Sequence, residues 1–201
     1  RQQPLPRQPA GHRNRRLGVS DEEAAVWRQQ CRQGLNAPLS HAAGRLFDSF
    51  SALLGIAPTD ATYEGQPAIR LEAAARRAAG DGRGELPFSI TEAQGLLCVD
   101  WREAFVRLAD ARVTAGLENE WALAAHRAVA EAALKMADFG VKQVPCDVIA
   151  LSGGVFMNRL LNELLVPRLE TMGLRVVVHR RIPPNDGCIA LGQAVVAGRG
   201  A

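Results

Sequence analysis

Two short stretches near the carboxyl end of the sequence contain the residues best suited to chemistry. The first is Ser152-Gly153-Gly154, where an apolar run ends and a helix is expected to follow. Because glycine has no Cβ, such a turn leaves backbone amides open to a ligand, and the positive end of the next helix favours an anion, most simply a phosphate. Tight turns also use glycine pairs for structural reasons alone, so both interpretations stay open.

The second stretch is the loop PPNDG at residues 183–187, which follows the next apolar run. Asp186 in this loop could cap the helix that is expected to begin near Gly187. It could equally point into the crevice beside the glycine turn and coordinate a divalent metal or a metal-bound phosphate. The pattern alone does not decide between these two roles.

Asn158 lies in the first turn of the helix that is expected from about Phe156 to Met172. Its carboxamide could reach a ligand above the glycine pair, or it could cap backbone groups of the helix. Without further context the pattern favours the cap.

Hydrophobic periodicity predicts the elements that position these residues. Residues 147–151 form a continuous apolar run, which is typical of a strand covered on both faces, and residues 174–179 predict a second strand. With a helix after each strand, this order predicts a parallel pair joined by a right-handed crossover. The carboxyl ends of parallel strands are where open α/β sheets bind their ligands.

The preceding part of the chain is mainly helical. An acidic first turn at residues 21–23 opens a short helix, and a hairpin is expected around Thr91-Glu92. On the helix expected at residues 118–139 an apolar stripe predicts a face that packs in the core. His126 lies beside this stripe and is interpreted as a surface residue, because no second histidine four residues away could form a metal-binding pair with it. The other expected segments are helices at 42–54, 67–79, 101–114 and 118–139, and strands at 86–90 and 95–99.

Composition indicates a folded chain without an obvious macromolecular ligand. The 201 residues are 47% hydrophobic, and 24 basic against 21 acidic residues give a net charge of +3, so we expect no nucleic-acid partner. No apolar run approaches the roughly 18 residues of a membrane helix. Four dispersed cysteines (Cys31, Cys98, Cys146 and Cys188) fit a reducing cytoplasm better than a disulfide framework or a zinc knuckle.

The first 16 residues differ from the rest of the chain. They are rich in Arg, Pro and Gln and contain no acidic residue, which predicts a flexible leader or an interdomain linker. Because the sequence does not begin with Met, we expect it to be a piece of a longer chain.

Four ordered blocks resemble the hydrogenase maturation carbamoyltransferases, the HypF family. They are GLNAPLSHAAGRLFDSFSALLGI, TYEGQPAIRLE, LSGGVFMNRLL and PPNDGCIALGQA, and the resemblance runs from about Leu17 to Gly198. The chain is more distantly similar to the tRNA threonylcarbamoyltransferases, which share a nucleotide-binding fold related to actin, hexokinase and Hsp70. The resemblance implies an α/β fold in which residues 17–201 form one helix-rich lobe with a small mixed sheet.

This resemblance also implies site residues and cofactors. The glycine pair would contact the phosphates of ATP or of a carbamoyl-adenylate, and Asn158 would lie near the adenosine. Asp48 would hold the ribose hydroxyls, and Asp186 would bind a divalent metal such as Fe, Zn or Mg. The nucleotide-binding residues implied are Asp48, Glu64, Gly65, Gly153, Gly154 and Asn158.

The implied reaction is the transfer of a carbamoyl group, made as an adenylate in another domain, to the carboxyl-terminal cysteine of a HypE-like partner. Backbone amides and a metal around the phosphate would stabilise the charge left on AMP. The thiolate would come from the partner, so no cysteine of this chain need be the nucleophile. The product leads to the cyanide ligands of [NiFe]-hydrogenase.

Two departures from the family pattern shape the expectation. The histidine pair HxxxH of the family's metal site is absent among His12, His41, His126 and His179, and so are the acylphosphatase-like, zinc-binding and adenylate-forming domains. We therefore expect the second lobe of a longer ATP-dependent enzyme, inactive in isolation. The alternatives are a tRNA threonylcarbamoyltransferase-like fragment, disfavoured because Ser49 replaces a lysine, and a non-catalytic nucleotide-binding or docking lobe.

Overall fold

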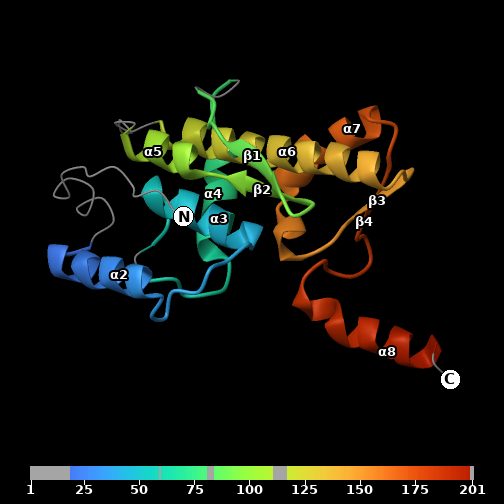
Figure 1. Ribbon diagram of the computed structural model, residues 1–201, viewed down its shortest axis with the longest axis horizontal. Helices are drawn as coiled ribbons and strands as arrows, with labels where there is room; N and C mark the ends of the chain where they lie inside the picture. The colour runs from blue at the N-terminus through green and yellow to red at the C-terminus, as the bar shows by residue number, and fades with distance from the viewer. Residues whose placement is uncertain (1–18, 59, 81–83, 111–116, 200–201) are drawn as a thin grey trace.

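The computed structural model describes residues 19–58, 60–80, 84–110 and 117–199, so the leader or linker predicted at residues 1–16 lies outside the described part. Helices dominate it, as Figure 1 shows. The elements are α2 (Asp21–Gln33), α3 (Ala43–Leu53), α4 (Gln66–Ala75), β1 (Ser89–Ala93), β2 (Leu96–Asp100), α5 (Arg102–Asp110), α6 (Glu118–Gln143), β3 (Val148–Leu151), η1 (Gly154–Met157), α7 (Arg159–Thr171), β4 (Arg175–Val178), η2 (Asp186–Cys188) and α8 (Ile189–Arg199), where η marks a short 3₁₀ helix.

The larger hydrophobic core lies between α3, α4, α5 and α6 and includes the first residues of α7. Phe50 on α3 is completely buried there, with its ring stacked on Phe105 at 5.2 Å between centroids and edge-on to Trp101 at 6.0 Å. The apolar stripe predicted on α6 consists of Trp121, Ala125, Val129, Ala132 and Met136. It faces the interior, except that Met136 is 45% exposed.

A smaller core lies between the second half of α6, α7 and the strands β3 and β4. Phe156 in η1 packs against both cores. This single ring, two residues after the glycine pair, therefore anchors the glycine turn to the junction of the two cores.

Strands β3 and β4 form the predicted parallel pair, with Val148 opposite Arg175 and Leu151 opposite Val178. The helices cover one face of this pair only. On the other face Ala150 is exposed, and Val177, which pairs with it, is 43% exposed. The expectation of a strand covered on both faces is therefore wrong for this chain.

Strands β1 and β2 form an antiparallel hairpin separate from the parallel pair, so the described strands make two small sheets. The hairpin is confirmed, but its turn is at Gln94-Gly95 and not at the predicted Thr91-Glu92. Both turn residues have positive φ, 56° and 75°, which suits a two-residue hairpin turn. The predicted helix-rich α/β class is confirmed.

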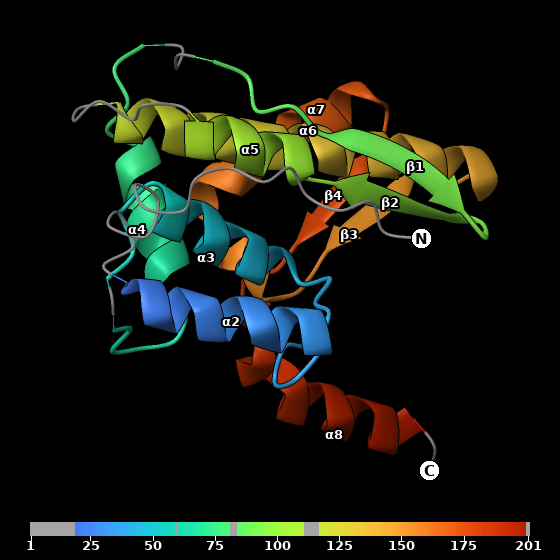
Figure 2. The ribbon, with the colours of Figure 1, turned by 60° about the vertical axis from the view of Figure 1, so that its left-hand side comes forward.

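Helices α2 and α8 lie at the margin of the molecule and bury no side chain (Figure 2). Ser20 and Glu23 form a reciprocal capping box at the start of α2, so this helix is stabilised locally and not by core packing. Among the helices in the described residues, none has the length and apolar composition that a membrane crossing requires.

The Phe50→Ala substitution should lower the free energy of unfolding by about 3–5 kcal/mol, because it removes a buried ring and leaves a cavity. Val196→Ala on α8, where the side chain is 73% exposed, should change it by no more than about 0.5 kcal/mol. Urea unfolding followed by circular dichroism measures both. Equal effects would contradict the placement of the core.

Candidate functional site

The glycine turn follows β3 and has two different glycines. Gly153 has φ 106° and ψ 155°, a conformation that residues with a side chain rarely adopt. Its N–H donates to the carbonyl of Pro184 at 2.8 Å. The sequence predicted that this amide is open to a ligand, and for Gly153 that prediction is wrong. At Gly154 the φ is not positive, and an added Cβ would meet only Asn185 Cβ, at 3.8 Å.

The helix after the turn begins later than predicted. The turn passes first into η1, and α7 starts at Arg159 and not at Phe156. Asn158 is the N-cap of α7, as the residue pattern favoured, and its Oδ1 accepts from the N–H of Leu161 at 2.9 Å.

A second acceptor at the start of α7 comes from another helix. Glu72 on α4 accepts from the N–H of Leu160 at 3.1 Å through Oε1. Two of the first amides of α7 are thus bonded to the protein itself, and a carboxylate already lies against the positive end of the helix. The expectation that this helix end is free for an anion is therefore wrong for the amides of Leu160 and Leu161.

Glu72 belongs to an ion-pair network between α4 and α7. Arg76, one turn further along α4, donates to Glu72 and pairs with Glu163 on α7 through two hydrogen bonds of 3.1 Å. Hydrogen bonding to Glu163 and Glu72 raises the pKa of Arg76. The network ties α4 to the first turns of α7 across the outside of the core.

His126 is fully buried, so its interpretation as a surface residue is wrong. Its Nδ1 donates to the carbonyl of Ala122 at 2.8 Å, and its Nε2 accepts from the Asn158 side-chain amide at 2.9 Å. The ring of Phe47 lies 4.8 Å away, between centroids. Burial lowers the pKa of His126, which keeps the imidazole neutral near pH 7.

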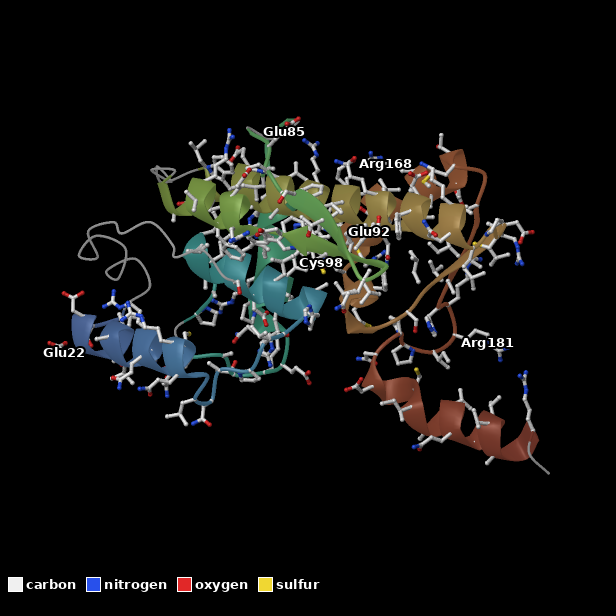
Figure 3. The ribbon with its side chains drawn as sticks, viewed as in Figure 1. Glu22, Glu85, Glu92, Cys98, Arg168 and Arg181 are labelled. Carbon is white, nitrogen blue, oxygen red and sulfur yellow. The ribbon has the colours of Figure 1, made fainter. Side chains whose placement is uncertain are left out.

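Ser152 and His179 meet at the carboxyl edge of the parallel pair. They follow the paired residues Leu151 and Val178, and His179 Nε2 lies 3.1 Å from Ser152 Oγ. Figure 3 shows Arg181 on the loop that leads from β4 towards α8. The edge beside the glycine turn therefore has a hydroxyl and an imidazole.

The loop after β4 shows that Asp186 is not the cap of the helix that follows it. Asn185, and not Asp186, caps η2, because its Oδ1 accepts from the N–H of Gly187 at 3.1 Å. Asp186 is the first residue of η2 and is exposed. Within the described ranges, no three histidine, cysteine, aspartate or glutamate side chains are grouped to hold a metal ion. The residues present therefore do not fit a complete metal site, to which Asp186 would contribute a single ligand.

Asp48 lies on α3, a helix that contacts η1. One carboxylate oxygen, Oδ2, is 3.5 Å from Arg45, and the other, Oδ1, is buried without a hydrogen-bond partner. An unpaired buried oxygen costs free energy that a ligand hydroxyl could recover.

Glu64 and Gly65 lie exposed in the turn before α4. Gly65 has φ 74° and precedes the helix, and Gln66 closes the turn by accepting from the N–H of Thr62 at 2.9 Å. These two residues lie at the opposite end of α4 from Arg76.

Sequence reasoning gave no role to Glu72, His126 or His179. The signal for Glu72 and His126 is a polar side chain in an alanine-rich helix face. Their partners lie 88 and 32 residues away, so no local spacing could have identified them.

Comparison with known proteins identifies this arrangement. The family model described as "Carbamoyltransferase, Kae1-like Domain, second subdomain" matches residues 6–193. The chain belongs to the HypF carbamoyltransferase family. The carbamoyltransferase HypF of Rhodobacter capsulatus is 36% identical over 170 residues, which cover 85% of this chain and 21% of that relative. The probable carbamoyltransferase HypF of Methanocaldococcus jannaschii is 29% identical over 180 residues, 88% of this chain and 22% of that relative.

The fold agrees with that of HypF. The crystal structure of full-length HypF in its phosphate- and nucleotide-bound form has a TM-score of 0.77 and 28% identity, over 90% of this chain and 23% of that one. The chain thus spans about a fifth of the length of these HypF proteins. The predicted membership of the HypF family is confirmed.

Substitution of the two glycines should separate their roles in folding. Gly153→Ala should lower the free energy of unfolding by about 1–3 kcal/mol, because alanine is strained at this φ and ψ. Gly154→Ala should change it by no more than about 0.5 kcal/mol, since the backbone is ordinary and the space is open. Chemical denaturation of both variants measures the difference, and a larger loss for Gly154→Ala would contradict the turn geometry.

Glu72→Ala should destabilise the fold by about 1.5–3 kcal/mol, since it removes the hydrogen bonds that the carboxylate accepts from Leu160 and Arg76. Glu163→Ala is the matched control, because it loses an exposed ion pair to the same arginine and should cost less than about 1 kcal/mol. Denaturation at low and high salt compares them. The same cost for both would show that the bond to α7 contributes nothing.

Proposed function

We propose that this chain forms the nucleotide-binding half of a carbamoyltransferase active site. Its ligand is ATP or the carbamoyl-adenylate, whose phosphate lies against Gly154 and η1. Membership of the HypF family supports carbamoyl transfer, and the HypF whose structure is described as phosphate- and nucleotide-bound supports the ligand class.

Gly154 carries the proposal. Gly153 must be glycine because of its backbone conformation, but nothing within the described structure requires glycine at 154. A side chain there would extend into open space at the carboxyl edge of β3. Since ligands of α/β proteins bind at this edge, the missing side chain leaves room for a phosphate.

The transfer of the carbamoyl group would develop negative charge on the phosphate that lies against this turn. When a partner thiolate attacks the carbamoyl carbon, the bond from that carbon to the phosphate oxygen breaks and AMP leaves with the electron pair. Backbone donors of the glycine turn and the Ser152 hydroxyl would stabilise this developing charge. The thiolate is supplied by the carboxyl-terminal cysteine of a HypE-like acceptor protein, so this chain contributes binding and charge stabilisation.

The other residues of the site bind the rest of the nucleotide. The Asp48 carboxylate, whose side chain is 26% exposed, would accept from a ribose hydroxyl. Asn158 lies beside the adenosine, and Glu64 with Gly65 lines the same pocket. Asp186 supplies one oxygen ligand to a divalent cation, either Fe, Zn or Mg, whose remaining ligands come from outside this chain.

The proposed process is the cytoplasmic maturation of [NiFe]-hydrogenase, with the upstream domains of a longer parent chain making the adenylate. Because one lobe holds only part of the site, the isolated chain would bind nucleotide weakly and turn nothing over.

Gly154→Val should weaken ATP binding to the 201-residue chain at least tenfold, because the valine side chain occupies the phosphate position. Gly140→Val, an exposed glycine near the end of α6 with open space around its Cα, is the matched control and should bind as the unmodified chain does. Isothermal titration with ATP and Mg²⁺ measures both, with unfolding curves to check the fold. Undiminished binding by Gly154→Val would overturn the phosphate position, and no saturable binding by the unmodified chain would overturn the proposed function.

A further inference from the structure

We propose that His126 is a positioning residue: its neutral imidazole fixes the orientation of the Asn158 carboxamide and thereby the start of α7 beside the nucleotide site. The structural part of this inference stands on the described contacts, and its effect on nucleotide binding rests on the function proposed above.

The hydrogen bonds of His126 determine its tautomer. Nδ1 faces the Ala122 carbonyl at 2.8 Å, which only accepts, so Nδ1 must have the proton. In a neutral ring Nε2 is then an acceptor. The group 2.9 Å from Nε2 must donate to it, and the Asn158 amide nitrogen does so.

This tautomer leaves the Asn158 carboxamide one orientation. With its nitrogen towards His126, its oxygen accepts from the N–H of Leu161 at 2.9 Å. A flipped carboxamide would place oxygen against the Nε2 lone pair and NH₂ against the Leu161 N–H, which are two repulsive contacts. Asn158 is only 9% exposed, so water cannot easily replace either bond.

Asn158 connects this bond network to the glycine turn. Its own N–H donates to the Val155 carbonyl at 3.1 Å in η1, while its side chain begins α7. A carboxamide that lost its orientation would release the Leu161 N–H and loosen the turn at residues 154–157. The Asn158 carboxamide uses one N–H for His126 and its oxygen for Leu161. Its second N–H is the group left for a ligand, so the orientation set by His126 makes Asn158 a donor and not an acceptor.

The surroundings favour the neutral ring. Phe47 from α3 packs on the imidazole. Two charged groups at α4 act on its pKa in opposite directions: Glu72 raises the pKa of His126 and Arg76 lowers it. Burial is the largest influence and lowers the pKa of His126. A leucine of similar volume would fill this site on α6 without polar partners, so space filling does not account for a histidine.

Protonation of His126 would place an N–H against the Asn158 NH₂ and break the arrangement. Since the imidazole has a lower pKa in the folded chain than its usual value of about 6.5, the unfolded chain binds the proton more readily below that pH. The folded form therefore loses stability as the pH falls below about 6.5, by up to tenfold in the folding equilibrium constant per pH unit.

The first test reads the tautomer in the 201-residue chain by long-range ¹H–¹⁵N NMR of the imidazole. We expect a proton on Nδ1 and none on Nε2 at pH 7. In Asn158→Asp, one carboxylate oxygen still accepts from Leu161 while the other faces Nε2, so the variant should raise the pKa of His126 above about 6.5. An Nε2-protonated ring in the unmodified chain, or an unchanged pKa in Asn158→Asp, overturns the proposal.

The second test compares His126→Leu with His126→Gln, whose side-chain oxygen can still accept from Asn158. Amide exchange of Leu161 should accelerate at least tenfold in His126→Leu and recover in part in His126→Gln, while Leu160, bonded to Glu72, and Leu165 keep their protection. A role in packing alone would leave Leu161 as protected as in the unmodified chain, and that result overturns the proposal. If His126→Leu does not fold, the tautomer and the Asn158→Asp titration decide.

ATP titration separates this inference from the proposed function. ATP affinity should fall at least tenfold in His126→Leu. In the unmodified chain it should fall only when the pH is low enough to protonate the buried imidazole, which requires a pH below the usual value of about 6.5. If the unmodified chain does not bind ATP, the proposed function fails while the NMR and exchange results still decide the role of His126. Unchanged affinity in His126→Leu with exposed Leu161 overturns the link to the nucleotide.

Discussion

The first turn of α7 has backbone amides that its own helix cannot satisfy, and the chain brings acceptors to them from two other places. Asn158 covers the amide of Leu161, and Glu72 reaches from α4 to that of Leu160. Asn158 is in turn bonded to His126 on α6. The start of α7 is therefore fixed to α4 and to α6, which both contribute to the larger core. The glycine turn precedes this point by a few residues, so its place at the edge of β3 depends on the same contacts.

This arrangement determines where a negatively charged ligand can bind. A helix start normally attracts anions through its free amides and its dipole. Here the carboxylate of Glu72 already uses that attraction, with Arg76 and Glu163 balancing the charge nearby. The phosphate proposed above is therefore assigned to the turn before α7, beside Ser152 and His179.

Periodicity was sufficient to predict the helices and the parallel pair, because their apolar faces repeat within a few residues. It failed where a partner is distant. His126 looks like a surface residue on a helical wheel, and only the packing of α3 and α7 against it reveals that it is buried. The sequence predicts that α7 starts at about Phe156, three residues before its actual start at Arg159, because a 3₁₀ turn and an α-helix have similar local sequences. The cap of η2 was assigned one residue late, since asparagine and aspartate are both suitable caps.

The site residues show the same limit. The resemblance indicates Asp48, while the loop pattern already indicates Asp186 as a cap or a metal ligand. The structure shows an unusual environment for the first alone, whose buried Oδ1 has no partner. The exposed Ala150 and Val177 could not be anticipated either. A continuous apolar run indicates how much surface a strand can bury, but not whether this chain supplies the covering.

The two adjacent glycines provide the clearest separation of fold from function. Gly153 is explained by the chain itself, since its φ of 106° is strained for any other residue and its N–H is bonded to Pro184. Gly154 has an ordinary backbone and room for a side chain, so packing within this chain gives no reason for its identity. Gly140 shares these two properties, so it is the location of Gly154 at the turn after β3, and not its backbone alone, that supports the proposed ligand. The turn lies at the carboxyl edge of β3, where open α/β sheets bind their ligands, which is why the proposal places the phosphate there.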